Sequence, residues 1–68
     1  MLRMTVLREQ RKWTKAELAR RTKMHPSGIG LIESGRLKPY ESQLAKIASV
    51  LGVRTPRTLL EEVHLSNR

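Results

Sequence analysis

The chain has 68 residues, of which 14 are Lys or Arg and 6 are Asp or Glu, so its formal net charge is +8. In a small domain this charge favours binding to a polyanion such as nucleic acid; the alternatives are a charged surface that only keeps the protein in solution, or an acidic protein partner. It contains no Cys, which excludes disulfides and thiolate metal sites and fits a reducing cytoplasm. No apolar run could span a membrane, the N-terminus is charged too early for a signal peptide, and the length suffices for one small domain.

Every sustained apolar spacing is helical, and no segment alternates as a strand does, which predicts an all-α fold. We expect a compact bundle of about five short helices within residues 1–65 and a frayed tail at 66–68. The first helix, with Met4 and Leu7 on one face, should run to about residue 11, and the next three should span residues 15–22, 26–34 and 41–50. A last one, capped at Thr55-Pro56, should contain Leu59, Leu60 and Val63. Gly35 and Gly52 should end the third and fourth helices, because glycine adopts a left-handed conformation without steric cost.

Residues 14–35 carry the start signals of two adjacent helices. Thr14 and Glu17 have the spacing of a capping box, in which the Thr14 hydroxyl accepts from the Glu17 amide and the Glu17 carboxylate binds the Thr14 amide. His25-Pro26 begins the second helix, since proline suits a first helical position. Hydrophobic staples are expected between Trp13 and Leu18 and between Met24 and Ile29. Two capped helices this close in a basic chain indicate a helix-turn-helix motif, whose second helix enters a DNA groove.

An ordered set of residues extends this pattern over most of the chain: Leu7-Arg8, Trp13-Thr14, Glu17-Leu18-Ala19, Ile29, Ile32-Glu33, Gly35, Pro39 and Leu51-Gly52-Val53. At this spacing the chain resembles the phage repressor and Cro-type helix-turn-helix family, also called the xenobiotic response element type. The resemblance implies a lambda-repressor-like domain and a cytoplasmic transcriptional regulator of bacterial, phage or mobile-element type. Such a regulator binds double-stranded DNA as a homodimer on a palindromic site, for example as a repressor.

The resemblance also implies an ion pair between Arg8 and Glu33 that joins the first helix to the third; the alternative is two unrelated surface charges. Ala19 lies where the motif helices should cross, which calls for a small side chain, although helix propensity alone would also explain it. Lys12 and Lys23 depart from the family pattern, because each replaces a frequent glycine. A left-handed Lys23 would cost about 1 kcal/mol.

We expect DNA contacts from the start of the second helix, from the third helix and from the loop after it. The candidate residues are Lys15, Lys23, His25, Ser27, Gly28, Gly30, Leu31, Arg36 and Lys38. Lys15 replaces a frequent Gln and suits a phosphate, because a helix N-terminus carries partial positive charge. The outward positions of the third helix, from Pro26 to Leu31, hold no Arg, Lys, Asn or Gln for bidentate base readout. This predicts weak base specificity, supplemented by His25, Lys23, dimer spacing or DNA deformability, or else a helix that faces a protein.

Other functions have less support. A protein-interaction module, such as an antitoxin or bridging-factor domain, is the main alternative. His25 and His64 have no partners at metal-ligand spacing, and Ser27 and Ser34 lack an arrangement of a base with a group that orients it, so we expect no metal, cofactor or enzymatic activity. The C-terminal apolar residues admit two interpretations, as core or as part of a dimer interface.

Overall fold

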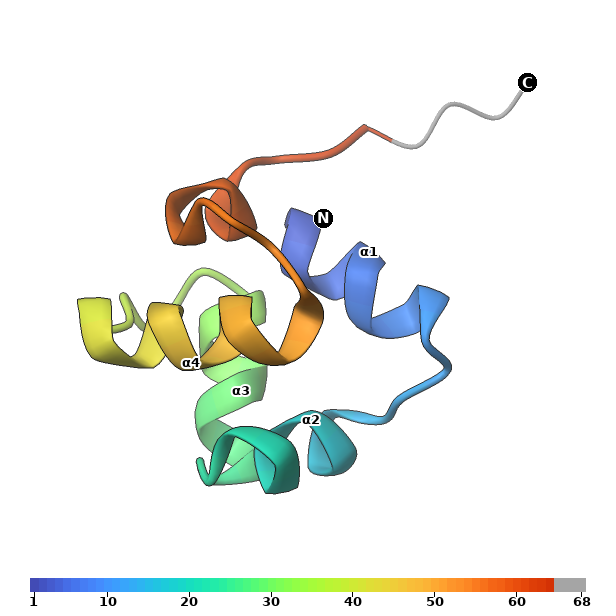
Figure 1. The fold of residues 1–68 in the computed structure, drawn as a ribbon, viewed down its shortest axis with the longest axis vertical. Helices are drawn as coiled ribbons and strands as arrows, with labels where there is room; N and C mark the ends of the chain where they lie inside the picture. Colours follow the sequence, from blue (N-terminus) through green and yellow to red (C-terminus); the bar gives the residue numbers. More distant parts are fainter. Residues whose placement is uncertain (65–68) are drawn as a thin grey trace.

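The computed structural model describes residues 1–64, and these residues form a bundle of helices (Figure 1). The elements are α1 (Arg3–Gln10), α2 (Lys15–Thr22), α3 (Pro26–Glu33), α4 (Glu41–Leu51) and the 3₁₀ helix η1 (Pro56–Leu60). The all-α prediction is confirmed, and the predicted helix ends of the first four helices agree to within one residue. In Figure 1, α4 crosses in front of α3, α2 lies below them, and α1 and η1 lie on the opposite side from α2.

Each α-helix ends with the same left-handed turn. The left-handed residues are Lys12, Lys23, Gly35 and Gly52, with φ angles of 59°, 59°, 81° and 75°. The amide of the next residue then donates to the carbonyl five positions before it at 2.8 to 3.2 Å, as in a Schellman motif. Gly35 and Gly52 therefore end their helices as predicted. Lys12 and Lys23 adopt the conformation that glycine would adopt more easily, at a cost of about 1 kcal/mol each.

The helix starts correct part of the sequence analysis. Thr14 Oγ1 accepts from the Glu17 amide at 3.0 Å, but the Glu17 carboxylate binds Arg20 and Arg21 instead of returning to the Thr14 amide. Charge-assisted bonds to two guanidinium groups are stronger than a bond to a neutral amide, so the second half of the predicted capping box is wrong. The bond that is missing at Thr14, from the N-cap amide to the side chain three residues later, is present at the start of α4, where the Tyr40 amide donates to Gln43 Oε1 at 2.8 Å.

The last predicted helix is also corrected. Its residues form a 3₁₀ helix that ends at Leu60, and the Thr55 side chain makes no capping hydrogen bond. Val63 lies beyond this helix, where its amide donates to the Met1 carbonyl at 2.7 Å. An antiparallel bridge between Leu2 and residue 62 joins the same two segments. This pairing draws the chain away from a helical path, and the tail predicted at 66–68 lies outside the described residues.

The core takes buried apolar residues from every helix. They are Met4, Leu18, Ala19, Ile29, Ile32, Leu44, Ile47, Ala48, Leu51 and Leu59. Leu60 is half-buried and packs against this cluster, and Val63 is half-buried as well. Ala19 is fully buried on α2, the helix that packs most extensively on α3. The core therefore fixes α2 and α3 in contact, with the outer side of α3 left free.

Candidate nucleic-acid interface

A buried ion pair anchors the last turn of α3. Arg8 Nε donates to Glu33 Oε2 at 2.8 Å and Arg8 Nη2 donates to Glu33 Oε1 at 3.1 Å, so the pair is bidentate. Both side chains are less than one tenth exposed. Arg8 Nη1 also donates to the Trp13 carbonyl at 2.7 Å. One guanidinium therefore joins α1, the α1–α2 loop and α3, which is the contact that the family resemblance implied.

The first turn of α3 is closed by His25. Its Nδ1 accepts from the Ser27 amide at 3.2 Å and lies 2.7 Å from Ser27 Oγ. Because Nδ1 accepts from that amide, the proton of the neutral ring is on Nε2, which remains a donor. Pro26 occupies the first helical position, where it sacrifices no hydrogen bond. His25 is thus the N-cap of α3, a role that occupies one of its two ring nitrogens.

The outer face of α3 has little side chain of its own. Ser27 and Leu31 are exposed, whereas Gly28 and Gly30 are half-buried. A Cβ added at Gly28 would meet no atom within 4 Å. A Cβ added at Gly30 would lie 3.9 Å from Cδ and 4.0 Å from Nζ of Lys15. The two glycines therefore differ, because only Gly30 lies under the side chain of another helix.

The loop after α3 folds back on that helix. The amides of Arg36 and Leu37 both donate to the Leu31 carbonyl, at 2.9 and 3.2 Å. Arg36, Leu37 and Lys38 are exposed. The turn holds Arg36 at the end of α3, whereas Lys38 lines a groove with residues of α4 and η1. The loop also exposes two large apolar residues, Leu37 and Tyr40, which were not predicted as part of this surface. An aromatic residue beside a proline in a basic loop was the signal that could have found Tyr40.

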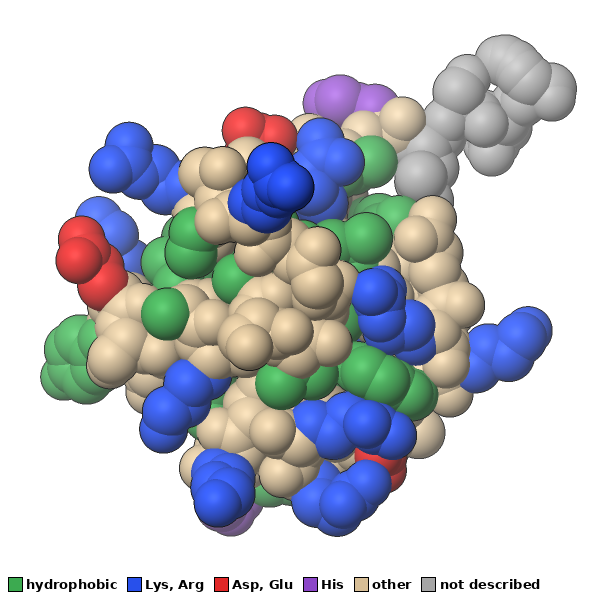
Figure 2. Space-filling view, viewed as in Figure 1, with side chains coloured by type: hydrophobic (Ala, Val, Ile, Leu, Met, Phe, Trp, Pro, Cys, Tyr) green, Lys and Arg blue, Asp and Glu red, His purple; other side chains and the backbone are tan. Residues whose placement is uncertain are grey.

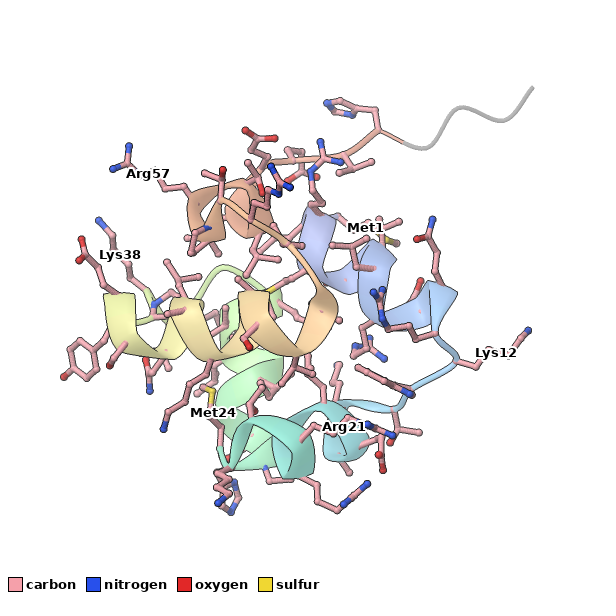
Figure 3. The ribbon with its side chains drawn as sticks, in the orientation of Figure 1. Met1, Lys12, Arg21, Met24, Lys38 and Arg57 are labelled. Carbon is pink, nitrogen blue, oxygen red and sulfur yellow. The ribbon has the colours of Figure 1, made fainter. Side chains whose placement is uncertain are left out.

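Lys23 lies in different surroundings. Together with Arg21 and Lys46 it lines a shallow groove between the end of α2 and α4. The neighbouring Arg21 guanidinium lies 4.2 Å from the centroid of the Trp13 ring, a cation–π contact. In Figure 3, Arg21 and Met24 lie in the part of the molecule that contains α2, whereas Lys38 lies near the start of α4, on the same side of the molecule as Arg57. The structure thus brings the side chain of Lys15 to Gly30 of α3, places Lys38 beside α4 and η1, and places Lys23 among cations of α2 and α4.

The surface charge is mainly basic. Figure 2 shows Lys and Arg side chains around most of the outline of the displayed face, with few acidic ones between them. Hydrogen bonds from Arg20, opposed in part by desolvation and assisted by Arg21, lower the pKa of Glu17. The same contact raises the pKa of Arg20. Within residues 1–64 no group of three His, Cys, Asp or Glu side chains could hold a metal ion. No helix among these residues is long and apolar enough to cross a membrane.

The family model of a helix-turn-helix domain matches residues 2–63, nearly the whole described chain. The chain belongs to the helix-turn-helix domain family. It is 38% identical over 47 residues to an uncharacterized HTH-type transcriptional regulator of Mycobacterium bovis and to its counterparts in two strains of Mycobacterium tuberculosis. The alignment covers 69% of this chain and 18% of each relative, so the chain spans about a fifth of the length of the curated relatives it matches. No solved structure matches it significantly.

Proposed function

We propose that this helix-turn-helix domain binds double-stranded DNA with α3 in the major groove and acts in transcriptional regulation. The observation that carries the proposal is the fixed placement of α3. Arg8 and Glu33 hold its last turn, His25 caps its first turn, and its outer face stays open beside a basic loop. A helix presented in this way matches the recognition helix of such motifs, and the relatives' names as transcriptional regulators support the same function.

Phosphate contacts flank α3 on both sides. The amides of Lys15 and Ala16 lie at the N-terminus of α2, which favours an anion, whereas the Glu17 amide is bonded to Thr14. Arg36 and Lys38 supply cations from the loop after α3. A net charge of +8 adds long-range attraction to the duplex. Affinity therefore comes mainly from the phosphate backbone, as in other basic DNA-binding domains.

We further propose a homodimer of the xenobiotic response element type that represses by occupying a palindromic site in the cytoplasm, without enzymatic activity. A groove between α4 and η1 supports a two-fold contact. Its lining includes apolar side chains, among them Leu44 and Leu60, and the charged residues Lys38, Glu41 and Arg57. In a symmetric dimer Glu41 of each copy faces Arg57 of the other. Glu41→Arg should weaken dimerisation in sedimentation, and adding Arg57→Glu should restore it.

The salt dependence of binding tests DNA recognition. Fluorescence anisotropy with a random duplex should give a log affinity that falls with log salt by about 0.9 per phosphate neutralised. Arg36→Gln should lower the magnitude of this slope by about one unit and weaken all sequences alike. Lys46→Gln is the matched control, because Lys46 lines the groove between α2 and α4, and it should leave the slope unchanged. Affinity that does not respond to salt would contradict the proposal.

A protein-interaction module is the second candidate. Leu31 and Leu37 are exposed on and beside the outer face of α3, at 42% and 41%, and Tyr40 is 76% exposed. Leu31 and Leu37 lie close together, since the Leu37 amide donates to the Leu31 carbonyl, and adjoining exposed apolar residues favour a protein surface more than a phosphate backbone. A monomer in gel filtration with no affinity for any duplex would support this candidate against DNA binding.

A further inference from the structure

The side chain of Lys15 crosses from α2 to the outer face of α3. It belongs to the first residue of α2, yet its Cδ and Nζ lie 3.9 and 4.0 Å from the point where a Cβ of Gly30 would stand. Gly30 lies in the interior of α3, one turn after Pro26. Because glycine has no side chain, the stem of Lys15 lies directly over the α3 backbone there. The ammonium group is thereby carried onto the helix that we propose enters the groove.

The ammonium of Lys15 is free to bind a ligand. Among residues 1–64 no ion pair includes Lys15, whereas Arg8, Arg20 and Arg21 are all held by carboxylates. The polar groups of α3 itself are partly engaged, since the Ser27 hydroxyl and amide both contact His25 Nδ1. Leu31 offers only apolar surface. Lys15 is therefore the cation that the folded chain presents at the otherwise blank face of α3.

We infer that Lys15 is the specificity-determining residue of this interface and reads a guanine from the major groove. The inference rests on the proposed DNA binding. In the major groove guanine presents two acceptors, N7 and O6, and a lysine ammonium can donate to both. Adenine, cytosine and thymine each present at most one acceptor at this edge. Gly30 is the positioning partner, since a long side chain there would occupy the space that the Lys15 stem now fills.

The test begins with a preferred site, selected from a random duplex library by the intact 68-residue chain. Anisotropy then measures affinity for this site and for duplexes in which each guanine is replaced in turn by 7-deazaguanine, which lacks the N7 acceptor. One guanine per half-site should prove critical, with a loss of about fivefold or more. In Lys15→Met the loss at that guanine should disappear. Arg36→Met removes one positive charge from the loop after α3 and should weaken all duplexes alike while keeping the guanine preference.

A steric series at position 30 tests the positioning. Gly30→Ala adds a methyl at ordinary contact distance from Lys15 and should keep the guanine preference, whereas Gly30→Leu should abolish it. Circular dichroism and melting curves establish that each variant is folded. A guanine preference that survives Lys15→Met, or a uniform loss on all duplexes in that variant, would overturn the inference while leaving DNA binding intact. Failure of the unaltered chain to bind any duplex would instead refute the proposed function.

Discussion

Replacing Gly28 by alanine should stabilise the protein, although the glycine lies on the proposed recognition helix. Gly28 sits in the first turn of α3 with helical backbone angles, so alanine can adopt its conformation. A Cβ built there meets no atom within 4 Å, so the methyl group introduces no clash. Alanine restricts the unfolded chain more than glycine does and suits a helix better. The substitution therefore measures the effect of backbone conformational preference on stability, without a change in side-chain packing.

The expected gain is about 0.5–1 kcal/mol in the free energy of unfolding. For a chain of this size the gain corresponds to a rise in melting temperature of roughly 2–8 °C. Gly35→Ala is a matched control, because a Cβ at Gly35 also meets nothing within 4 Å, but its φ of 81° is left-handed. That variant should lose about 1 kcal/mol or more. The two substitutions differ mainly in backbone conformation, so their opposite signs measure its contribution.

Urea denaturation followed by Trp13 fluorescence and by far-ultraviolet circular dichroism provides the measurement. The midpoint should rise for Gly28→Ala and fall for Gly35→Ala, with the slope m unchanged in both. An unchanged or lower midpoint for Gly28→Ala would refute the reasoning. It would mean that α3 does not hold Gly28 in a regular helical turn with free space around its Cα.

Three further predictions concern charge and strain. Arg8→Met and Glu33→Gln should each lower the free energy of unfolding by about 3 kcal/mol, because each leaves the charge of the other residue buried without its partner. A double-mutant cycle should give a coupling of about 1 kcal/mol or more, and a coupling of zero would contradict the ion pair. Lys23→Gly should stabilise by up to about 1 kcal/mol by removing left-handed strain, as thermal melting can check, and a loss would argue against the φ of 59°. Because the pKa of Glu17 is lowered in the folded state, its carboxylate stabilises the fold at any pH above the ordinary glutamate pKa. That stability is lost as the pH falls through the pKa of Glu17 in the folded state, so Glu17→Gln should flatten the acid side of the stability–pH curve.

The motif helices were predictable because their start and stop signals are local. Thr14 and Pro26 mark starts and Gly35 marks a stop through chemistry that acts over four residues. The bidentate pair of Arg8 and Glu33 followed only from family resemblance, since nothing in their spacing brings them together.

Other features depend on contacts between distant or competing groups. The bridge between Leu2 and residue 62 joins chain segments 60 residues apart, so no local signal announces it. The Glu17 carboxylate binds Arg20 and Arg21 in place of the Thr14 amide, and this choice depends on a competition among the three donors. The approach of Lys15 to Gly30 requires the relative placement of two helices. Local rules therefore predicted the elements, whereas side-chain partners between elements required the fold.

The guanidinium of Arg8 has a mechanical consequence for any duplex that the domain binds. It fastens the carboxyl end of α3 to α1 and to the Trp13 carbonyl, while the turn before α3, in which the Met24 amide donates to the Ala19 carbonyl, fastens the amino end to α2. A helix held at both ends cannot rock or slide to follow the walls of a groove. The domain then acts as a rigid template, and the adjustment on binding falls to the DNA, in its groove width and local twist.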